Sequence, residues 1–142
     1  TEAHAVNAVV GYLGSTVTAQ GVATNLENGA ATWTLNSDLA AESSTLTISD
    51  ENGREVYSTP FAVPAGQSNF TWDGHTSTGQ QAADGVYRIQ IQGQTANGDP
   101  VDVNTAITGR VSSVDVTGSE PRLRIGDVEV SMGAIQRVEA HQ

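Results

Sequence analysis

The sequence predicts an all-β protein, and two observations indicate this class. From Ser15 onward Val, Thr and Ile are frequent, and clusters of Gly, Asn and Asp interrupt them at short intervals. These clusters separate about ten short segments, at a spacing typical of β-sandwiches and small β-barrels. A chain of 142 residues has room for one ordinary domain or two small ones.

The first segment is the exception to the β pattern. Its apolar residues Val6, Val9, Val10 and Leu13 follow the spacing of one helical stripe, and Gly14 stands where a helix would end. We therefore expect this segment to be the end of an N-terminal helix, the last piece of a longer one.

The next segments predict two strands and a connection. The stretches STVTAQGVA (15–23) and AATWTL (30–35) are rich in β-formers, and the turn sequence LENG lies between them. The following SDLAAES (37–43) is polar and poor in β-formers. We expect it to connect two strands.

The stretch TLTISDENGREVYS (45–58) predicts a β-hairpin. Leu46 and Ile48 alternate with polar residues, and Asn52-Gly53 is suited to a turn that needs positive φ. The following FAVPAGQS (61–68) contains a proline and is preceded by Pro60. Because proline cannot donate to a central ladder, this part is expected to be an edge or a loop.

The second half of the chain predicts further short strands. They are NFTW (69–72), VYRIQIQG (86–93), PVDVNTAITG (100–109), GRVSSVDVTG (109–118), RLRIGDVEVS (122–131) and AIQRVEA (134–140). Turns are expected at 96–99 and at Gly126-Asp127. The valines of 109–118 do not keep one alternation, so we expect a bulge near Ser112-Ser113.

Composition and charge exclude several classes of function. The formal net charge is −10, because sixteen acidic residues face six arginines and no lysine. Such a surface lacks the clustered cations that bind nucleic acid or an anionic membrane surface, so we expect neither partner. The chain has no cysteine, which excludes disulfides and thiolate metal sites. No apolar run approaches the roughly 18 residues of a membrane helix.

Catalytic motifs are missing from the sequence. It contains no G-x-S-x-G elbow, no P-loop and no G-x-G-x-x-G after a strand. His4 and His141 lie near the ends of the chain. A triad of His75, Ser77 and Asp73 would lie on one loop tip, with nothing to exclude water or orient the imidazole. We therefore expect no catalytic residue and no enzyme activity.

Metal binding is also not expected. Asp73 and Asp84 could approach one another, but an EF-hand-type loop needs alternating oxygens and a terminal bidentate Glu. The pairs Asp73-Gly74 and Asp84-Gly85 are more simply turns, in which Asp bonds its own downstream backbone and Gly takes positive φ. Trp72 and Tyr87 are then core residues on the flanking strands, and no cofactor or metal is implied.

Two other groups are interpreted as structural. Trp33, Tyr12 and Tyr57 are too scattered for an aromatic ligand cage. Arg122 and Arg124, two residues apart, share one face of a short strand and are expected to be a solvated face rather than an anion site.

The run from Thr45 to Val138 carries a combination of motifs. It contains the hairpin TLTISDENGREVY, then F-x-W-D-G with a later Gly, D-G-x-Y, G-x-V-x-x-V, L-x-I-G-x-V-x-V and a closing I-x-x-V. Ten residues of these motifs, called here the marker residues, are Phe70, Trp72, Asp73, Gly74, Gly79, Asp84, Gly85, Tyr87, Gly109 and Gly126.

In these motifs the chain resembles the bacterial flagellar hook-capping proteins. The stretch F-x-W-D-G…D-G-x-Y by itself marks many secreted immunoglobulin-like modules. The flanking motifs distinguish the hook-capping family from these modules: a V-T-V-like strand, W-T-L and G-x-V-x-x-V…L-x-I-G. One departure is Ala82-Ala83, where the family often has L-P, and it weakens only the turn. Together the matches cover most of residues 15–140.

The resemblance implies a fold and a domain organisation. An immunoglobulin/fibronectin-III-like β-sandwich (38–105) would be inserted into a split, small Tudor-like β-barrel (15–37 plus 106–142), after the end of an N-terminal helix (1–14). The ten marker residues would hold these β-structures together and catalyse nothing.

The resemblance also implies a non-enzymatic function. The protein would be a scaffold of hook assembly and flagellum biogenesis, located outside the cell at the distal tip of the growing hook of the bacterial flagellum. Its partner would be the flagellar hook protein, and the full-length protein would self-associate into a cap. Export by the flagellar type III apparatus would use a signal in the family's N-terminal region. The alternative is an immunoglobulin-like spacer or carbohydrate-binding module of a secreted bacterial protein.

Overall fold

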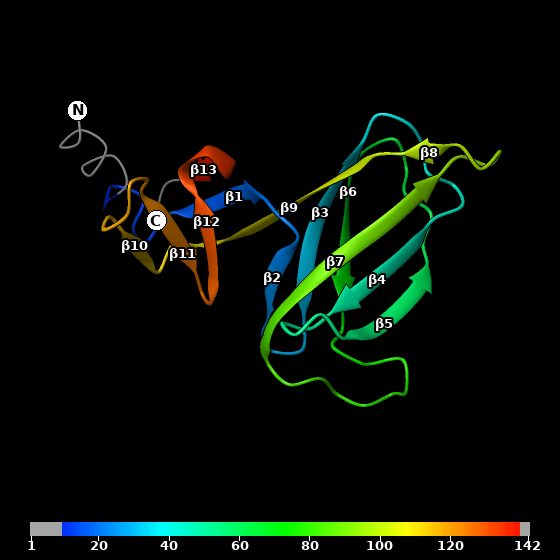
Figure 1. Cartoon of the computed structure of the whole chain (residues 1–142), viewed down its shortest axis with the longest axis horizontal. Coiled ribbons are helices and arrows are strands. Elements are labelled where there is room, and N and C mark those ends of the chain that lie inside the picture. Colours follow the sequence, from blue (N-terminus) through cyan, green and yellow to red (C-terminus); the bar gives the residue numbers. More distant parts are fainter. Residues whose placement is uncertain (1–9, 140–142) are drawn as a thin grey trace. The chain divides into compact units, whose positions relative to one another are not determined.

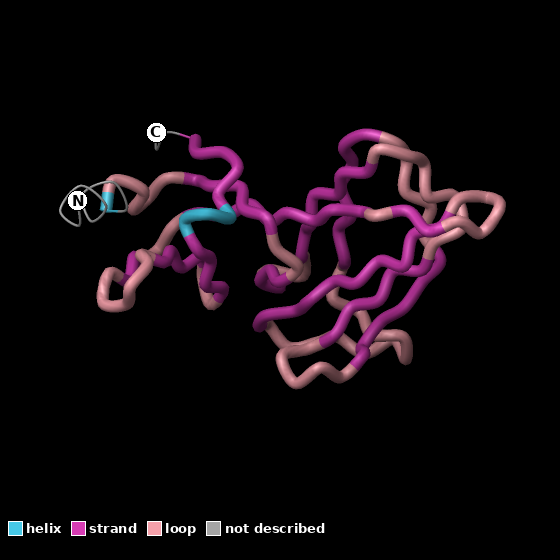
Figure 2. Tube along the Cα trace, turned by 45° about the horizontal axis from the view of Figure 1, so that its top comes forward, coloured by secondary structure: helices cyan, strands magenta, loops and turns pink. Residues whose placement is uncertain are grey.

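The computed structural model describes residues 10–139, and the chain divides into two compact units (Figure 1). Residues 22–106 form the first, called here the inserted unit because it interrupts the other in sequence. Residues 10–21 and 107–139 form the second, the flanking unit. Strands dominate both units, and helix is limited to short pieces (Figure 2).

Two antiparallel sheets build the inserted unit. One has the order β9–β3–β6, from β3 (Ala31–Ser37), β6 (Gly66–Trp72) and the first part of β9 (Val103–Arg110). The other has the order β2–β7–β4–β5, from β2 (Ala23–Leu26), β4 (Thr45–Ser49), β5 (Glu55–Pro60) and β7 (Gly85–Gln94). The short β8 (Pro100–Val101) pairs with the end of β7.

The alternation along each strand sends one row of side chains into the core of this sandwich. In β3, Trp33 and Leu35 are fully buried, whereas Thr32 and Asn36 are exposed on the opposite face. The large strand side chains that are at most 2% exposed come from both sheets: Leu26, Trp33, Leu35, Leu46, Ile48 and Trp72. One hydrophobic core therefore lies between the two sheets.

The flanking unit has a second, smaller core. Its strands are β1 (Thr16–Gln20) and β13 (Ile135–Glu139) with the second part of β9, and β10 (Ser113–Asp115), β11 (Arg122–Ile125) and β12 (Val128–Ser131) in a separate sheet. A 3₁₀ turn, η1 (Met132–Ala134), precedes β13. The buried apolar residues are Val17, Ala19, Ile107, Val111, Leu123, Ile125, Val128 and Val130.

Several predicted elements occur in the structure. β4 and β5 form the predicted hairpin, and Gly53 takes φ 82° in its turn. Gly126 takes φ 59° between β11 and β12, as its turn requires. The polar stretch 37–43 leads from the end of β3 toward β4 and forms no strand of its own. Within it, Ala41 makes an isolated β-bridge with Val63.

Three predicted strands are interrupted. Residues 15–23 break between β1 and β2, 100–109 break between β8 and β9, and 109–118 break at 111–112 instead of forming a simple bulge. In the first case the chain stops pairing with β13 and starts pairing with β7. The sequence of β-forming residues does not reveal such breaks, because it does not record which strand is the partner.

The predicted domain boundary differs from the observed division. We expected residues 15–37 to belong to the barrel, yet β2 pairs with β7 and β3 pairs with β6 inside the inserted unit. The division falls between Gly21 and Val22. At the other end it falls between Ala106 and Ile107, next to the expected position.

The expected N-terminal helix lies mostly outside the described residues, which begin at Val10. From there a turn leads to Gly14, where the backbone takes φ 81°. This left-handed conformation is the one that commonly follows the last turn of a helix.

Candidate functional site

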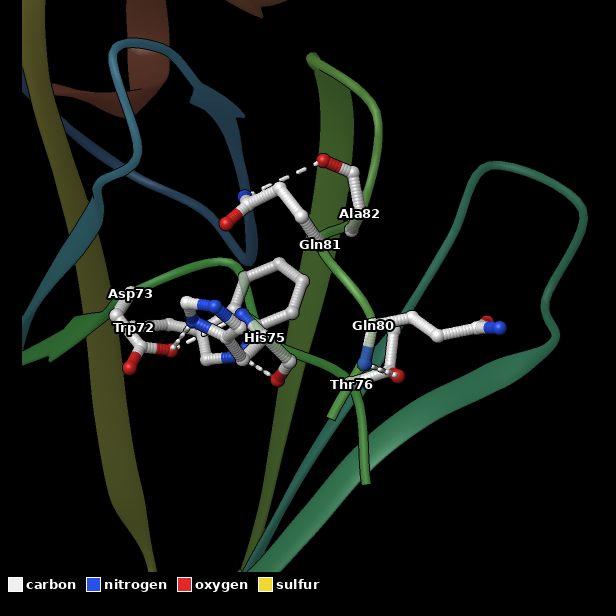
Figure 3. Close-up of polar contacts among 7 residues, drawn as sticks. All are labelled: Trp72, Asp73, His75, Thr76, Gln80, Gln81 and Ala82. Carbon is white, nitrogen blue, oxygen red and sulfur yellow. Dashed lines mark hydrogen bonds and ion pairs between the residues drawn. The ribbon is translucent and has the colours of Figure 1, made fainter. Parts of the chain in front are cut away.

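The loop from Asp73 to Asp84, between β6 and β7, contains four of the ten marker residues and is the first candidate site. Trp72 ends β6 with its ring buried, and its indole Nε1 donates a hydrogen bond to the carbonyl of His75, 2.9 Å away (Figure 3). The indole therefore satisfies its one polar group by fixing the first turn of the loop.

The same turn uses the Asp73 carboxylate. Asp73 Oδ1 accepts a hydrogen bond from the backbone N–H of His75 at 3.0 Å (Figure 3). Gly74 takes φ 84°. The hydrogen bond from the His75 N–H lowers the pKa of Asp73 from its ordinary value. This is the Asp-Gly turn geometry that the sequence predicts.

Backbone pairing closes the rest of the loop. The N–H of Ala82 donates to the carbonyl of Gly74 at 2.8 Å, and the N–H of Thr76 donates to the carbonyl of Gln80 at the same distance. Gly79 makes the tight turn between them with φ 87°. The tip is also bound to β5, because the N–H of Ser77 donates to the carbonyl of Val56 at 3.0 Å. The loop is thus a small hairpin with a defined structure.

Tyr87 fixes the far end of the loop. Its hydroxyl donates to the carbonyl of Ala83 at 2.7 Å, four residues upstream. Its ring packs edge-on against Trp72, with ring centroids 5.0 Å apart. A tyrosine near the start of a strand that bonds back to the preceding corner is a feature of immunoglobulin-like sandwiches. Burial, followed by the charges of Asp50, Asp84 and Glu51, raises the pKa of Tyr87.

The remaining markers have different surroundings. Phe70 lies on β6 between two aromatic rings. Its ring centroid is 6.4 Å from that of Trp33 and 5.1 Å from that of Phe61. Gly109 of β9 faces Ile125 of β11 so closely that an added Cβ would lie 2.3 Å from its Cγ2. Gly85 begins β7, where it pairs with Leu26.

The loop does not assemble a nucleophile. His75 Nδ1 lies 3.4 Å from Asp73 Oδ1, and both side chains are more than half exposed. Ser77 is exposed too, and in residues 10–139 its side chain makes no hydrogen bond to His75. The three side chains lie on an exposed loop tip that does not exclude water, and the serine–histidine hydrogen bond that a nucleophile requires is not made there.

Metal ligands do not gather in the described part of the chain. No group of three or more His, Asp or Glu residues there is close enough to hold an ion. Since Ca²⁺ takes six or more oxygens, Asp73 and Asp84 do not provide a site.

Two arginines make a cross-strand ion-pair cluster rather than an open cationic site. Arg122 Nε contacts Glu129 Oε1, and Arg124 Nη1 lies 3.8 Å from Glu129 Oε2. All three side chains are about half exposed, so the cluster is solvated, as expected. The carboxylate that neutralises it comes from β12, opposite Arg124.

Sequence reasoning missed one surface depression. A pocket of about 490 Å³ in the inserted unit is lined mainly by polar groups, among them Glu42, Ser44, Gln92 and Gln94. The Ser44 hydroxyl is already engaged, because it donates to the carbonyl of Ala41 and accepts from the N–H of Gln94. The pocket residues come from separate loops and strand ends, so no short sequence motif predicts the pocket.

Comparison with known proteins shows the family. The model of the FlgD Ig-like domain matches residues 19–98, more than half of the chain. The chain belongs to the FlgD Ig-like domain family. The match includes the whole loop from Asp73 to Asp84, so this loop is part of the family's immunoglobulin-like domain. A comparison with curated proteins finds no match.

Solved structures of the family share the fold. FlgD from P. aeruginosa is 22% identical, with a TM-score of 0.74 over 89% of this chain and 97% of that one. FlgD from Xanthomonas campestris is 23% identical, with a TM-score of 0.74 over 96% of this chain and 99% of that one. Its structure is described as giving insights into the hook capping essential for flagellar assembly. Truncated FlgD from Helicobacter pylori is 20% identical, with a TM-score of 0.54.

These likenesses confirm the predicted all-β fold class. At this identity they show the fold alone. No helix in the described part of the chain has the length and apolarity needed to cross a membrane.

Proposed function

We propose that the chain is the β-structured part of a flagellar hook-capping protein. The observation that carries the proposal is the family match over residues 19–98, extended by a likeness to Xanthomonas FlgD that spans nearly the whole of both chains. In this proposal the protein works outside the cell, at the distal tip of the growing hook, after export by the flagellar type III apparatus. Copies of the full-length protein form the cap.

The mechanism is differential binding without covalent chemistry. The cap retains hook subunits that arrive at the tip, favours their folding into the hook lattice, and leaves when the hook is complete. Such a contact must form and break repeatedly, which suits polar, charged surfaces better than large apolar ones. The chain supports this role by its net charge of −10 and by large apolar side chains that are mostly buried.

The marker residues have a structural role in this proposal. The hydrogen bonds of Trp72, Asp73 and Tyr87 hold the loop between β6 and β7, and Gly109 allows two sheets of the flanking unit to approach. The scaffold then presents its surfaces rigidly, and no step requires an enzyme or a cofactor.

The two tryptophans do not favour the carbohydrate-binding alternative. Sugar rings stack on exposed aromatic side chains, whereas Trp33 and Trp72 are 0% and 2% exposed. Both indoles also use their N–H groups within the fold.

A secretion assay tests the proposal. In a strain that lacks the gene, we expect loss of swimming and accumulation of monomeric hook protein in the culture medium, both reversed by the wild-type gene. A strain that still swims, and whose hook protein stays cell-associated, would contradict the capping role.

A further inference from the structure

The outermost strands of the sheets differ in how well their free edges are protected. Within residues 10–139 the strands at the ends of the sheet orders are β2, β5, β6, β10, β12 and β13; the two-residue β8, which contains Pro100, pairs with β7 outside these orders. An unpaired row of N–H and C=O groups can accept a strand from another chain, and natural proteins prevent this with charged side chains, proline or short edge strands. Each terminal strand can therefore be compared by these three devices.

Five of the six strands carry at least one such device. Charges or proline occur in four of them: Glu55 and Pro60 in β5, Arg137 and Glu139 in β13, Asp115 in β10, and Glu129 in β12. The fifth, β2, is uncharged but only four residues long.

Strand β6 has none of these devices. It is seven residues long, GQSNFTW, without charge or proline. Gln67, Asn69 and Thr71 are exposed. Of the two aromatic residues in the strand, Trp72 is buried and Phe70 is half-buried. The adjacent strand β3 presents Thr32 and Asn36 on the same outer face, so this surface continues uncharged across two strands.

The absence of charge is notable in this chain. Ten of its sixteen acidic residues and only two of its six arginines lie in residues 22–106, the unit that contains β6. Two such units repel one another wherever carboxylates face carboxylates. In a symmetric pair the same surface of both copies comes together, so an acidic surface would meet another acidic surface. A contact surface without charged residues avoids this repulsion.

We propose that two copies of this chain associate by antiparallel pairing of β6 with β6, about a two-fold axis at Asn69. Asn69 then faces Asn69, Gln67 faces Thr71, and Ser68 faces Phe70. No pair contains a charge, and the exposed part of Phe70 is covered by the second copy. The sheet β9–β3–β6 continues into its symmetric counterpart, and the backbone groups of both free edges become paired.

Analytical ultracentrifugation of the whole chain, from about 10 µM to about 1 mM, tests the association. We expect a dimer that strengthens with added salt, because salt screens the remaining repulsion. Asn69→Lys places two cations opposite one another at the axis, and it should weaken the dimer about tenfold or more. The matched control Ser58→Lys adds the same charge to the exposed surface of β5 and should leave the dimer unchanged.

A cross-link tests the register. Because the chain has no cysteine, Asn69→Cys introduces a single thiol. Directly opposed residues of antiparallel strands have Cα atoms about 4.5–5.5 Å apart, which a disulfide can span. With oxidised glutathione as the oxidant, Asn69→Cys should form a covalent dimer at least about tenfold faster than Ser58→Cys.

A wild-type chain that stays monomeric to about 1 mM overturns the proposal. Equal weakening by Asn69→Lys and Ser58→Lys, or equal rates of cross-linking at the two positions, also overturns it. The pairing rests on the strand and not on hook capping. If hooks were intact in a strain without the gene, the proposed function would be wrong, but the dimer could still form. If the chain were monomeric but restored hooks, the dimer would be wrong and the proposed function would stand.

Discussion

Tyr87 shows how one side chain joins the candidate loop to the core. Its ring lies against Trp72, and its hydroxyl donates to the Ala83 carbonyl. The sequence predicts a core position for this tyrosine. The partner of its hydroxyl is not predictable in the same way, because it depends on how the chain turns between Ala83 and β7.

Replacing Tyr87 with Phe measures that hydrogen bond. We expect Tyr87→Phe to lower the free energy of unfolding by about 1 kcal/mol, the usual net contribution of such a bond. Urea denaturation followed by tryptophan fluorescence gives the value. Tyr57→Phe is the control, because the Tyr57 ring also packs near Trp72 but its hydroxyl makes no hydrogen bond in the described chain. Equal losses in the two variants would show that the Ala83 contact contributes nothing.

The Asp73 turn gives a pH-dependent prediction. The His75 N–H lowers the folded-state pKa of Asp73 below 3.8, so its stabilising effect is present above pH 3.8 and is lost as the pH falls through the folded-state value. Asp73→Asn keeps an oxygen acceptor but removes the charge. We expect it to lower the Tm at pH 7, with a difference from wild type that shrinks as the pH falls below 3.8. A difference of the same size at every pH is the contrary result.

At the scale of elements, local turn chemistry was predictable and strand partners were not. Asn52-Gly53 and Gly126-Asp127 require positive φ within a few residues, and the structure has these turns where the sequence predicts them. The break at Gly21 and the pairing of β2 with β7 depend on residues far along the chain. A continuous run of β-forming residues therefore suggested one strand where there are two.

The close approach of β9 and β11 is another feature of this scale. Gly109 appears in the motif G-x-V-x-x-V, but only the structure gives its reason, which is the Ile125 side chain packed against its Cα. We expect Gly109→Ala to lower the free energy of unfolding by about 1–3 kcal/mol, the usual cost of overpacking a core. Thermal denaturation would measure it.

Gly133→Ala is the control for this variant. A Cβ at Gly133 would meet nothing within 4 Å, and its φ is not in the left-handed region. Its Tm should change by less than that of Gly109→Ala. If the two alanine variants were equally stable, the packing explanation for Gly109 would be wrong.

At the scale of the whole molecule, each unit has its own core. The core of the inserted unit contains Trp33, Leu35, Leu46, Ile48 and Trp72, and all five belong to residues 22–106. Composition and strand spacing predicted an all-β chain, but the boundary at Gly21 could not be derived from them. Neither could the family's activity, since the motifs here describe turns and packing rather than chemistry.

The complete core predicts that residues 22–106 fold when expressed alone. We expect a cooperative urea transition and a near-ultraviolet circular dichroism signal from the packed tryptophans. Leu46→Ala in the same fragment should cost about 2–5 kcal/mol, as expected for a fully buried leucine. A gradual transition without aromatic signal would mean that the inserted unit depends on the rest of the chain.

The central claim is that this protein caps the growing hook. Electron microscopy of flagellar basal bodies from a strain without the gene tests it most directly. The account predicts basal bodies that end at the rod and carry no hook, with hooks restored by the wild-type gene. Hooks of normal length and number in the deletion strain would contradict it, and an immunoglobulin-like module of another secreted protein would then be the better explanation.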